Sequence, residues 1–367
     1  MENNSSNIFD PAFLIKELIK IESISGNESK LVHYLENFLN ENNIYFKREG
    51  NNIIISVCSP NFNENFDKTL LICSHIDTVP VCNGWTKDPF GAQIETISND
   101  IKIFGLGAND ALASVISILH STISTYKEII SGQLKGRLIA AIVCEEEKGN
   151  LGFVRIEKDL PNYDYAIFGE PTTLKIGYCM RGSMKLKAFA FGKSCHASRP
   201  HEGLNASWEL INLLTKLKNL PLKDNSPWGT ATCEPVLIQG GTAENQIPDK
   251  ITVTIDSRPT WEVNNEKILE LLDKENISYE IIRNIRRAQS CPLDSPLIHA
   301  IKEIIPNSST YAFGGSCDMA FSRAKDSIVF GPGSSERSHS ADEYILLSEL
   351  KAGCDSYEKI IRKVFSI

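Results

Sequence analysis

The sequence lacks three features that would assign it to familiar classes: paired cysteines, a basic segment and a long apolar run. Its ten cysteines are scattered, and no two have the C-x-x-C spacing of a cysteine zinc site or redox motif. The net charge is −8 and no long Lys/Arg cluster occurs, so we expect neither nucleic acid nor a membrane surface as a partner. No apolar run has transmembrane length, and residues 1–20 lack the pattern of a secretory signal. These absences predict a cytoplasmic protein with free thiols.

Up to Pro171 the sequence contains an alternation of strand and helix patterns. The segments 69–75 and 136–144 are apolar almost throughout, as strands covered on both faces are. A helical pattern over 111–125 lies between them in the chain. Ser25 and Glu28 have the spacing of a capping box that would start an earlier helix. The order of elements predicts an α/β domain with helices on both faces of its sheet.

The pattern changes in the middle of the chain. The segment 183–191 alternates between apolar and polar residues, as a strand with one exposed face does. The elements that follow give a β-α-β-β-α-β order, which is typical of a small ferredoxin-like module. From about Cys291 the α/β pattern resumes. We therefore predict an α/β domain formed by residues 1–177 and 288–367, interrupted by an inserted α+β domain at 178–287.

Polar residues follow the apolar strands at the points where the strands end. His75 and Asp77 close the strand 69–75, and they share one face because alternate strand residues point the same way. The other strand ends are followed by Asp110, by Glu145–Glu147, by Glu170 and by His339. Sites of open α/β sheets lie beyond the carboxyl ends of the strands. So many carboxylates would repel one another unless a cation neutralised them, and this set suffices for two divalent ions of the zinc type.

Each of these residues also has an interpretation without function. Asp110 could be the N-cap of a helix, and Glu145–Glu147 could form a solvated acidic turn. His75 alone could be a buried histidine that is satisfied by hydrogen bonds. Their coincidence at one edge of the sheet is what favours a metal site.

Seven motifs in the chain resemble those of one metallopeptidase family, in the same order. They are SHIDTVP, GLGANDALAS, CEEEKGNLG, FGEPT, CHASRPHEGLNA, GGTAENQIPDK and GPGSSERSHSADEY. The family contains acetylornithine deacetylase, succinyl-diaminopimelate desuccinylase, aminoacylase and glutamate carboxypeptidases. The resemblance implies a zinc-peptidase-like catalytic domain that binds two Zn²⁺, with Co²⁺ or Mn²⁺ as alternatives. It also implies that the inserted ferredoxin-like domain is a lid through which two copies form a homodimer.

The resemblance assigns the metal ligands by their position in these motifs. His75 and Glu170 would complete one site. Glu147 and His339 would complete the other. Asp110 would bridge the two ions.

Three further residues would be catalytic by the same resemblance. Asp77 would lie behind His75 and fix its tautomer. Glu146 would be the general base that takes a proton from the attacking water and returns it to the leaving amine. A shift of the alignment by one residue would make Glu145 the base instead. His196, in the inserted domain, would reach in from the partner subunit to stabilise the oxyanion, or else it is a surface histidine of the lid.

Three residues match positions that hold substrate carboxylates in relatives, namely Arg181, Asn245 and Arg258. A forked guanidinium suits that task. Each arginine could equally lie at the surface or at the end of a strand.

The resemblance predicts a small N-acyl amino acid as the substrate. The motifs GWTKDPF and GPGSSERSHSADEY most resemble those of the acetylornithine deacetylase branch, whose members work in arginine biosynthesis. This predicts N-acetylornithine, with N-succinylornithine or N-acylcitrulline as variants. Succinyl-diaminopimelate desuccinylase and a carboxypeptidase or dipeptidase are alternatives within the family. An inactive, metal-free binding relative is the alternative of another class, disfavoured because a dead site has no physical reason to keep repelling carboxylates together.

Overall fold

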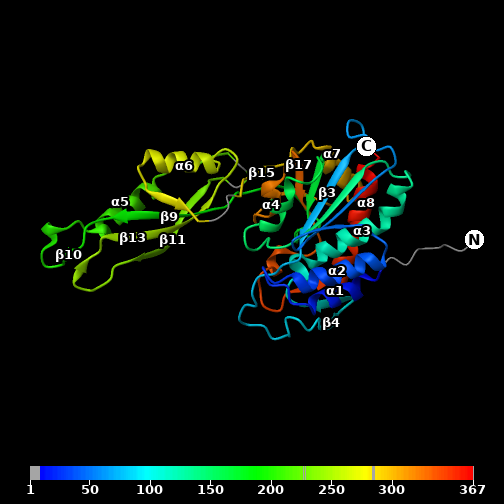
Figure 1. The fold of residues 1–367 in the computed structure, drawn as a ribbon, viewed down its shortest axis with the longest axis horizontal. Helices are drawn as coiled ribbons and strands as arrows, with labels where there is room; N and C mark the ends of the chain where they lie inside the picture. Colours follow the sequence, from blue (N-terminus) through cyan, green and yellow to red (C-terminus); the bar gives the residue numbers. More distant parts are fainter. Residues whose placement is uncertain (1–8, 226, 228, 283–285, 367) are drawn as a thin grey trace, which may run out of the picture. The chain divides into compact units, whose positions relative to one another are not determined.

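The computed structural model describes residues 9–225, 227, 229–282 and 286–366, and the chain divides into two compact units (Figure 1). The first unit comprises residues 1–179, 290–311 and 317–367, and the second comprises 180–289 and 312–316. The main boundaries, at 179/180 and 289/290, lie two residues from the limits that we predict from the sequence. None of the helices in the described residues is long and apolar enough to cross a membrane.

The largest sheet has nine strands, and its central strands are parallel. In spatial order its nine strands are β1 (Lys47–Glu49), β2 (Asn52–Cys58), β6 (Arg137–Val143), β3 (Thr69–His75), β7 (Tyr165–Phe168), β17 (Asp326–Val329), β8 (Ile176–Met180) and β15 (Gln289–Ser290), with β16 (Thr310–Phe313) paired to β8. Strands β6, β3, β7 and β17 run parallel, with His75 opposite Val143 and Cys73 opposite Phe168. Their carboxyl ends therefore meet at one edge of the sheet.

Helices cover both faces of this sheet, as predicted. They are α1 (Pro11–Ile19), α2 (Ser29–Glu41), α3 (Ala113–Ile130), α4 (Leu151–Glu157), α7 (Pro296–Ile304) and α8 (Leu347–Val364). All except α4 share one apolar cluster with Leu70 of β3. Leu71 points to the opposite face and is equally buried. On that face Phe153 of α4 packs edge-on against Phe168 of β7, with ring centres 5.3 Å apart.

A small three-stranded sheet joins two segments that the chain separates widely. Its strands are β4 (Ile94–Ile97), β5 (Asp100–Phe104) and β18 (Tyr344–Leu346), and β18 pairs antiparallel with β5. The amide of Gly105, just after β5, donates to the carbonyl of Glu343, just before β18, at 2.9 Å. The segment that contains His339 is thereby held beside the turn that contains Asp110.

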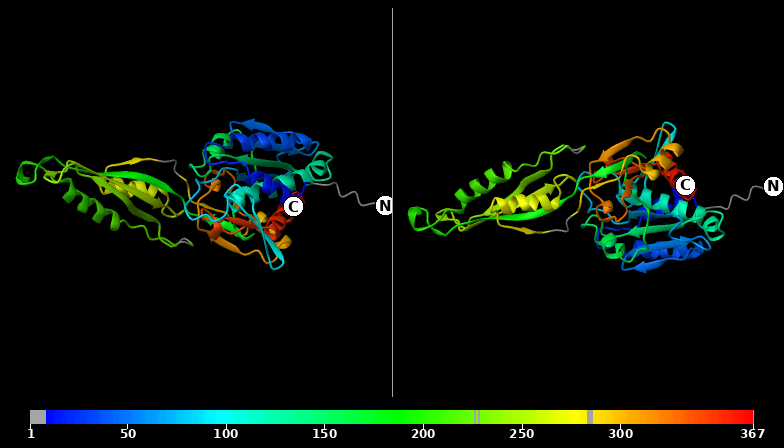
Figure 2. Two further views of the ribbon diagram at one scale, coloured as in Figure 1. Left: turned by 90° about the horizontal axis from the view of Figure 1, so that it is seen from below. Right: turned by 90° about the horizontal axis from the view of Figure 1, so that it is seen from above.

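The second unit has the predicted β-α-β-β-α-β order and is ferredoxin-like. Its elements are β9 (Met184–Phe191), α5 (Ala206–Lys218), β11 (Thr232–Gly240), β13 (Lys250–Arg258), α6 (Asn265–Lys274) and β14 (Tyr279–Ile281). The antiparallel sheet has the order β11-β13-β9-β14. Leu213 of α5 and Ile268 of α6 share one core with Leu186 of β9, so both helices pack on one face (Figure 2). A short ribbon of β10 (Cys195–His196) and β12 (Gln246–Ile247) extends from this unit.

Candidate metal centre

The parallel strands bring the predicted site residues of the first unit to one edge. His75 is the last residue of β3, and Glu147 lies in the turn that follows β6. Glu170 comes two residues after β7, and His339 lies in the segment between β17 and β18. Asp110 comes from the turn between β5 and α3, where its peptide bond to Ala111 is cis.

Three of these residues form a first group. His75 Nε2 lies 3.3 Å from Asp110 Oδ1 and 3.9 Å from Glu170 Oε2. One nitrogen and two oxygens of the three side chains lie within 4.8 Å of one another. His75 Nε2 is buried, yet no group in the described part of the chain makes a hydrogen bond to it. A buried ring nitrogen that faces two carboxylate oxygens without a hydrogen bond is an arrangement that a divalent cation would complete.

A second group shares Asp110 with the first. His339 Nε2 lies 2.7 Å from Glu147 Oε1 and 3.7 Å from Asp110 Oδ2. The ligand atoms of these three side chains also lie within 4.8 Å of one another. Asp110 therefore presents one oxygen to each histidine, as a carboxylate that bridges two cations does.

The carboxylates hold positive charge on the histidines. Burial lowers the pKa of His75, but the neighbouring Asp110 and Glu170 outweigh this and raise that pKa well above its usual value. The hydrogen bond to Glu147 raises the pKa of His339 to about 9. Burial raises the pKa of Glu170 to about 7, although His75 opposes the change. The cluster thus binds protons where divalent cations would supply the same charge, so its donor set fits metal ions.

Asp77 contacts the site in a way that differs from the prediction in one respect. The ring nitrogen Nδ1 of His75 lies 2.9 Å from the backbone carbonyl oxygen of Asp77 and 3.7 Å from its carboxylate. The backbone carbonyl, rather than the carboxylate, therefore keeps the proton on Nδ1 and leaves Nε2 for the cluster. The carboxylate accepts hydrogen bonds from Ser25 Oγ at 2.5 Å and from the amides of Glu146 and Glu147 at 3.0 and 3.1 Å.

The three consecutive glutamates point to different partners. Glu145, with φ +53°, contacts Arg155 Nη2 at 3.2 Å. The carboxylate of Glu146 accepts a hydrogen bond from Asn150 Nδ2 at 2.7 Å. Glu147 contacts His339, as described above.

Several residues around the site carry no role in the prediction. The buried Glu343 accepts hydrogen bonds from the amides of Asn109 and Asp110, at 2.8 and 2.9 Å. Asp318 lies 2.8 Å from Asn150 Nδ2. Glu343 stands in the motif GPGSSERSHSADEY, whereas Asp318 stands in none of the seven motifs. No local pattern predicts their contacts, because the paired residues are 168 to 234 positions apart in the sequence.

The other predicted residues lie in the second unit. His196 is exposed on β10, with Nδ1 2.7 Å from Ser198 Oγ, and the carbonyl of Asn245 accepts a hydrogen bond from the next amide, that of residue 197, at 2.9 Å. His196 and Asn245 are thus neighbours. Arg181 Nη2 donates to a backbone carbonyl at 3.2 Å, and Arg258 Nε contacts Asp256 at 2.6 Å.

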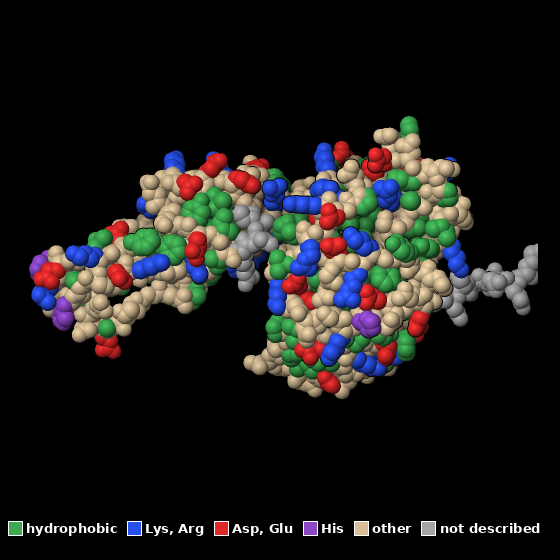
Figure 3. All heavy atoms as spheres, in the orientation of Figure 1, with side chains coloured by type: hydrophobic (Ala, Val, Ile, Leu, Met, Phe, Trp, Pro, Cys, Tyr) green, Lys and Arg blue, Asp and Glu red, His purple; other side chains and the backbone are tan. Residues whose placement is uncertain are grey.

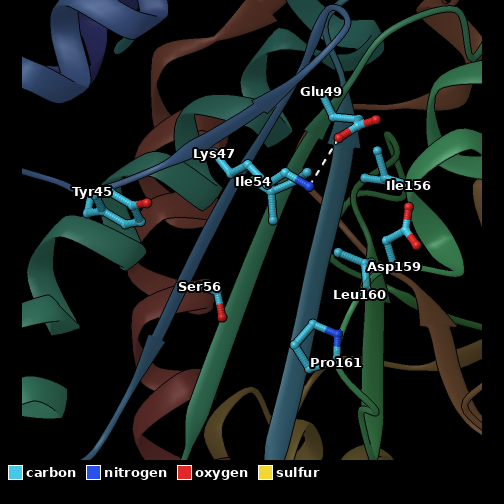
Figure 4. Close-up of a pocket in the computed structure, with 9 residues that line it drawn as sticks. All are labelled: Tyr45, Lys47, Glu49, Ile54, Ser56, Ile156, Asp159, Leu160 and Pro161. Carbon is cyan, nitrogen blue, oxygen red and sulfur yellow. Dashed lines mark ion pairs between the residues drawn. The ribbon is translucent and has the colours of Figure 1, made fainter.

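A separate pocket lies over β1 and β2, at the edge of the large sheet (Figure 4). Tyr45, Ile54 and Leu160 are among the residues that line it, and Lys47 and Glu49 form an ion pair of 3.1 Å in its lining. None of the predicted site residues lines this pocket, so we assign it no part in the chemistry.

Clustered imidazoles and carboxylates at the carboxyl edge of an α/β sheet are typical of metal-dependent hydrolases. Residues 71–363 match the model of peptidase family M20/M25/M40, and the chain belongs to this family.

Relatives of known name support the same class. Over 98% of this chain and 99% of the relative, the chain is 26% identical to succinyl-diaminopimelate desuccinylase of Ehrlichia canis. Over 77% of this chain and 76% of the relative, it is 26% identical to acetylornithine deacetylase of Myxococcus xanthus. The chain is therefore a metal-dependent amidohydrolase.

Solved structures share the fold across the whole chain. The M20 family metallo-carboxypeptidase of Sulfolobus solfataricus superposes with a TM-score of 0.78 at 18% identity, over 98% of this chain and 100% of that one. A dinuclear metal-binding peptidase of the M20 family from Bacillus subtilis gives a TM-score of 0.70 at 13% identity, over 97% of each chain. The predicted architecture of the family is thus confirmed.

Proposed function

We propose that this chain hydrolyses the amide bond of an N-acyl amino acid in arginine biosynthesis. N-acetylornithine is the first candidate substrate, with N-succinylornithine and N-acylcitrulline as variants. The observation that carries the proposal is the arrangement around Asp110, whose two oxygens lie 3.3 Å from His75 Nε2 and 3.7 Å from His339 Nε2. One carboxylate between two imidazoles suits a pair of divalent cations.

We propose Zn²⁺ for both positions, with Co²⁺ or Mn²⁺ as alternatives. His75, Asp110 and Glu170 would hold one ion. Asp110, Glu147 and His339 would hold the other. When bound, ions of this type lower the pKa of water and polarise a carbonyl group.

In this proposal Glu146 is the general base. It takes a proton from the attacking water and gives it to the leaving amine. The contacts of its neighbours support this register, because Glu145 is paired with Arg155 and Glu147 is paired with His339. Glu146→Ala should therefore abolish turnover while the metal content is unchanged, and Glu145→Ala should stay active. The reverse result would shift the base to Glu145.

The remaining residues of the proposal belong to the second unit. His196 of the partner subunit would stabilise the oxyanion, and we propose Arg181, Asn245 and Arg258 as the residues that hold substrate carboxylates. Because Arg258 is paired with Asp256, it would have to exchange that partner for a substrate carboxylate.

A desuccinylase is the second candidate, because the chain covers nearly the full length of the relative with that name. The fold similarity to a metallo-carboxypeptidase supports a carboxypeptidase or dipeptidase as a further alternative. Comparison of kcat/KM for N-acetylornithine, N-succinylornithine, N-acetylcitrulline, N-succinyl-diaminopimelate and a dipeptide decides among them. The proposal fails if another class of substrate is turned over fastest.

The inactive binding relative is tested by metal analysis and by ninhydrin detection of released amine. Bound metal and amine release from N-acetylornithine are expected. Absence of both after reconstitution with zinc would favour the binding protein.

We also propose a cytoplasmic homodimer that forms through the second unit. All ten cysteines are free thiols, which supports a reducing compartment. Strand β11 is an edge strand whose Val236, Leu237 and Ile238 are half exposed, and Trp208 and Ile211 of α5 are exposed as well. Figure 3 shows hydrophobic side chains, in green, on the surface of this unit. A second copy would cover such a surface and edge, so sedimentation should give a dimer that Trp208→Glu with Ile211→Glu converts to monomer.

A further inference from the structure

The carboxylate of Glu146 is held by a side chain that also contacts a second buried acid. Asn150 Nδ2 donates to Glu146 Oε1 at 2.7 Å and to Asp318 Oδ1 at 2.8 Å. Asn150 is fully buried, and Glu146 and Asp318 are 6% and 3% exposed. The amide group therefore lies between two carboxylates that are, like itself, buried.

The chemistry of a primary amide determines how Asn150 is oriented. Its nitrogen carries two hydrogens, which is one for each carboxylate, whereas its oxygen would repel both. Asn150 Oδ1 is itself buried, and no group in the described residues donates a hydrogen bond to it. A buried amide oxygen without a hydrogen bond is costly, so the two hydrogen bonds that Asn150 Nδ2 donates must hold the side chain in this orientation.

A tight backbone turn brings Asn150 close to Glu146, four residues earlier in the chain. The amides of Gly149 and Asn150 both donate to the carbonyl of Glu146 at 2.9 Å. Asn150 has φ +64°, a conformation that asparagine and glycine adopt more readily than other residues do. Asp318, by contrast, comes from a short helix at Asp318–Phe321 that packs against α4, which begins at Leu151. Two segments far apart in the sequence thus meet at one amide.

We propose that Asn150 and Asp318 are positioning residues for Glu146. Asn150 fixes the carboxylate of Glu146 in one orientation, and Asp318 anchors the amide that does so. The inference rests on the proposed function, in which Glu146 is the general base. A base must keep its carboxylate oxygen within hydrogen-bond reach of the proton that it removes, and loss of alignment by about 1 Å costs about 100-fold in rate.

The first test is Asn150→Gly, because glycine accepts the same backbone conformation but has no amide side chain. We expect kcat to fall by about 10- to 100-fold, with KM within about two-fold and the metal content unchanged. Asn43→Gly is the matched control, because Asn43 has φ +57° but is exposed in the turn after α2. It should leave kcat unchanged. The visible spectrum of the cobalt-loaded protein should be the same in all three proteins, which reports intact metal ligands independently of activity.

A double-mutant cycle separates positioning from general support of the fold. In Glu146→Asp the carboxylate is one methylene shorter and no longer reaches the Asn150 amide, so adding Asn150→Gly should lower kcat by less than about two-fold. If Asn150→Gly lowers kcat by the same factor in both backgrounds, the positioning role is refuted. An altered cobalt spectrum in Asn150→Gly would refute it as well, since the residue would then support the metal ligands.

Asp318 is tested by a conservative pair of variants. Asp318→Asn keeps an oxygen that can accept from Asn150, so kcat should stay within about three-fold of wild type. Asp318→Ala removes the acceptor and should lower kcat by at least about 10-fold. Equal kcat in the two variants would overturn the anchoring role. Failure of the proposed function is distinguishable, because Glu146→Ala would then retain turnover whatever the Asn150 variants do.

Discussion

Glu343 provides the sharpest test of how charge is balanced around the candidate metal centre. It is 2% exposed, and its carboxylate accepts hydrogen bonds from the amides of Gly107, Asn109 and Asp110 at 3.1, 2.8 and 2.9 Å. Burial, followed by the negative charge of Asp110, raises the pKa of Glu343 from 4.5 to about 8, although the three hydrogen bonds oppose the change. The metal-free protein therefore favours the protonated acid.

The sign of the pH dependence follows from this shift. The folded pKa lies above the unfolded value, so the stability that the group contributes is fully present below about pH 4.5 and is lost as the pH rises through about 8. The difference of about 3.5 units, from 4.5 to about 8, corresponds to at most about 5 kcal/mol at ~1.36 kcal/mol per unit. The raised pKa values of Glu170 and His339 act in the same direction, up to about pH 9. Divalent cations beside Asp110 would oppose the loss.

The assay compares urea unfolding of wild type and Glu343→Gln, each metal-free, at pH 5, 6, 7 and 8. A protonated glutamate resembles glutamine, so the two proteins should have similar free energies of unfolding at pH 5. At pH 8 the wild type should be less stable than the variant by several kcal/mol, up to the limit of about 5 kcal/mol. Zinc should restore the wild type. A difference between the two proteins that stays constant from pH 5 to pH 8 would refute the reasoning.

Three further predictions concern Asp77, Gly152 and the two histidines of the candidate metal centre. Asp77→Asn leaves one of the three hydrogen-bond donors to its carboxylate unpaired, so titration calorimetry should show metal affinity about 10- to 100-fold lower and urea unfolding a loss of about 1–3 kcal/mol; wild-type affinity would contradict this. A methyl group at Gly152 would lie 2.1 Å from the carbonyl of Cys144, so Gly152→Ala should lose about 1–3 kcal/mol in urea unfolding, and an unchanged midpoint would contradict the packing. Raised pKa values keep His75 and His339 protonated at pH 7 and Glu170 and Glu343 partly so, so zinc should release at least two protons per chain in a pH-stat, and release below one would contradict this.

The parts of the fold that can be predicted from the sequence are the helices and strands whose apolar residues recur with a regular local spacing. The apolar strand 69–75 and the helical pattern that overlaps α3 identify an α/β sheet, and parallel strands must end at one edge. That geometry is why His75 and Glu170 can be placed together before any coordinates are known. The alternating strand 183–191 identifies the second unit in the same way.

Contacts between distant segments have no such periodic signal. Ser25 and Glu28 have the spacing of a capping box, but this prediction is wrong. Ser25 donates to Asp77, and Glu28, at the N-cap of α2, makes no side-chain capping bond and accepts from the amide of Gly26. A serine and a glutamate three residues apart have the same spacing whether or not they form a capping box. Tertiary packing decides which partner the serine hydroxyl binds.

The same limit applies to the acids behind the site. Glu343 follows a predicted ligand by four residues, but nothing in its local pattern shows that it accepts from the turn of Asp110, 233 positions earlier. Asp318 reaches Asn150 across 168 positions. The role of such a buried carboxylate can be inferred only when the structure shows which groups donate hydrogen bonds to it.

Anomalous scattering at the zinc edge from crystals of the reconstituted protein tests the central claim most directly. We predict two peaks that flank the side chain of Asp110, one beside His75 and Glu170 and the other beside Glu147 and His339. If the protein carries zinc but the map shows no peak beside Asp110, or shows the peaks beside other residues, the account is contradicted.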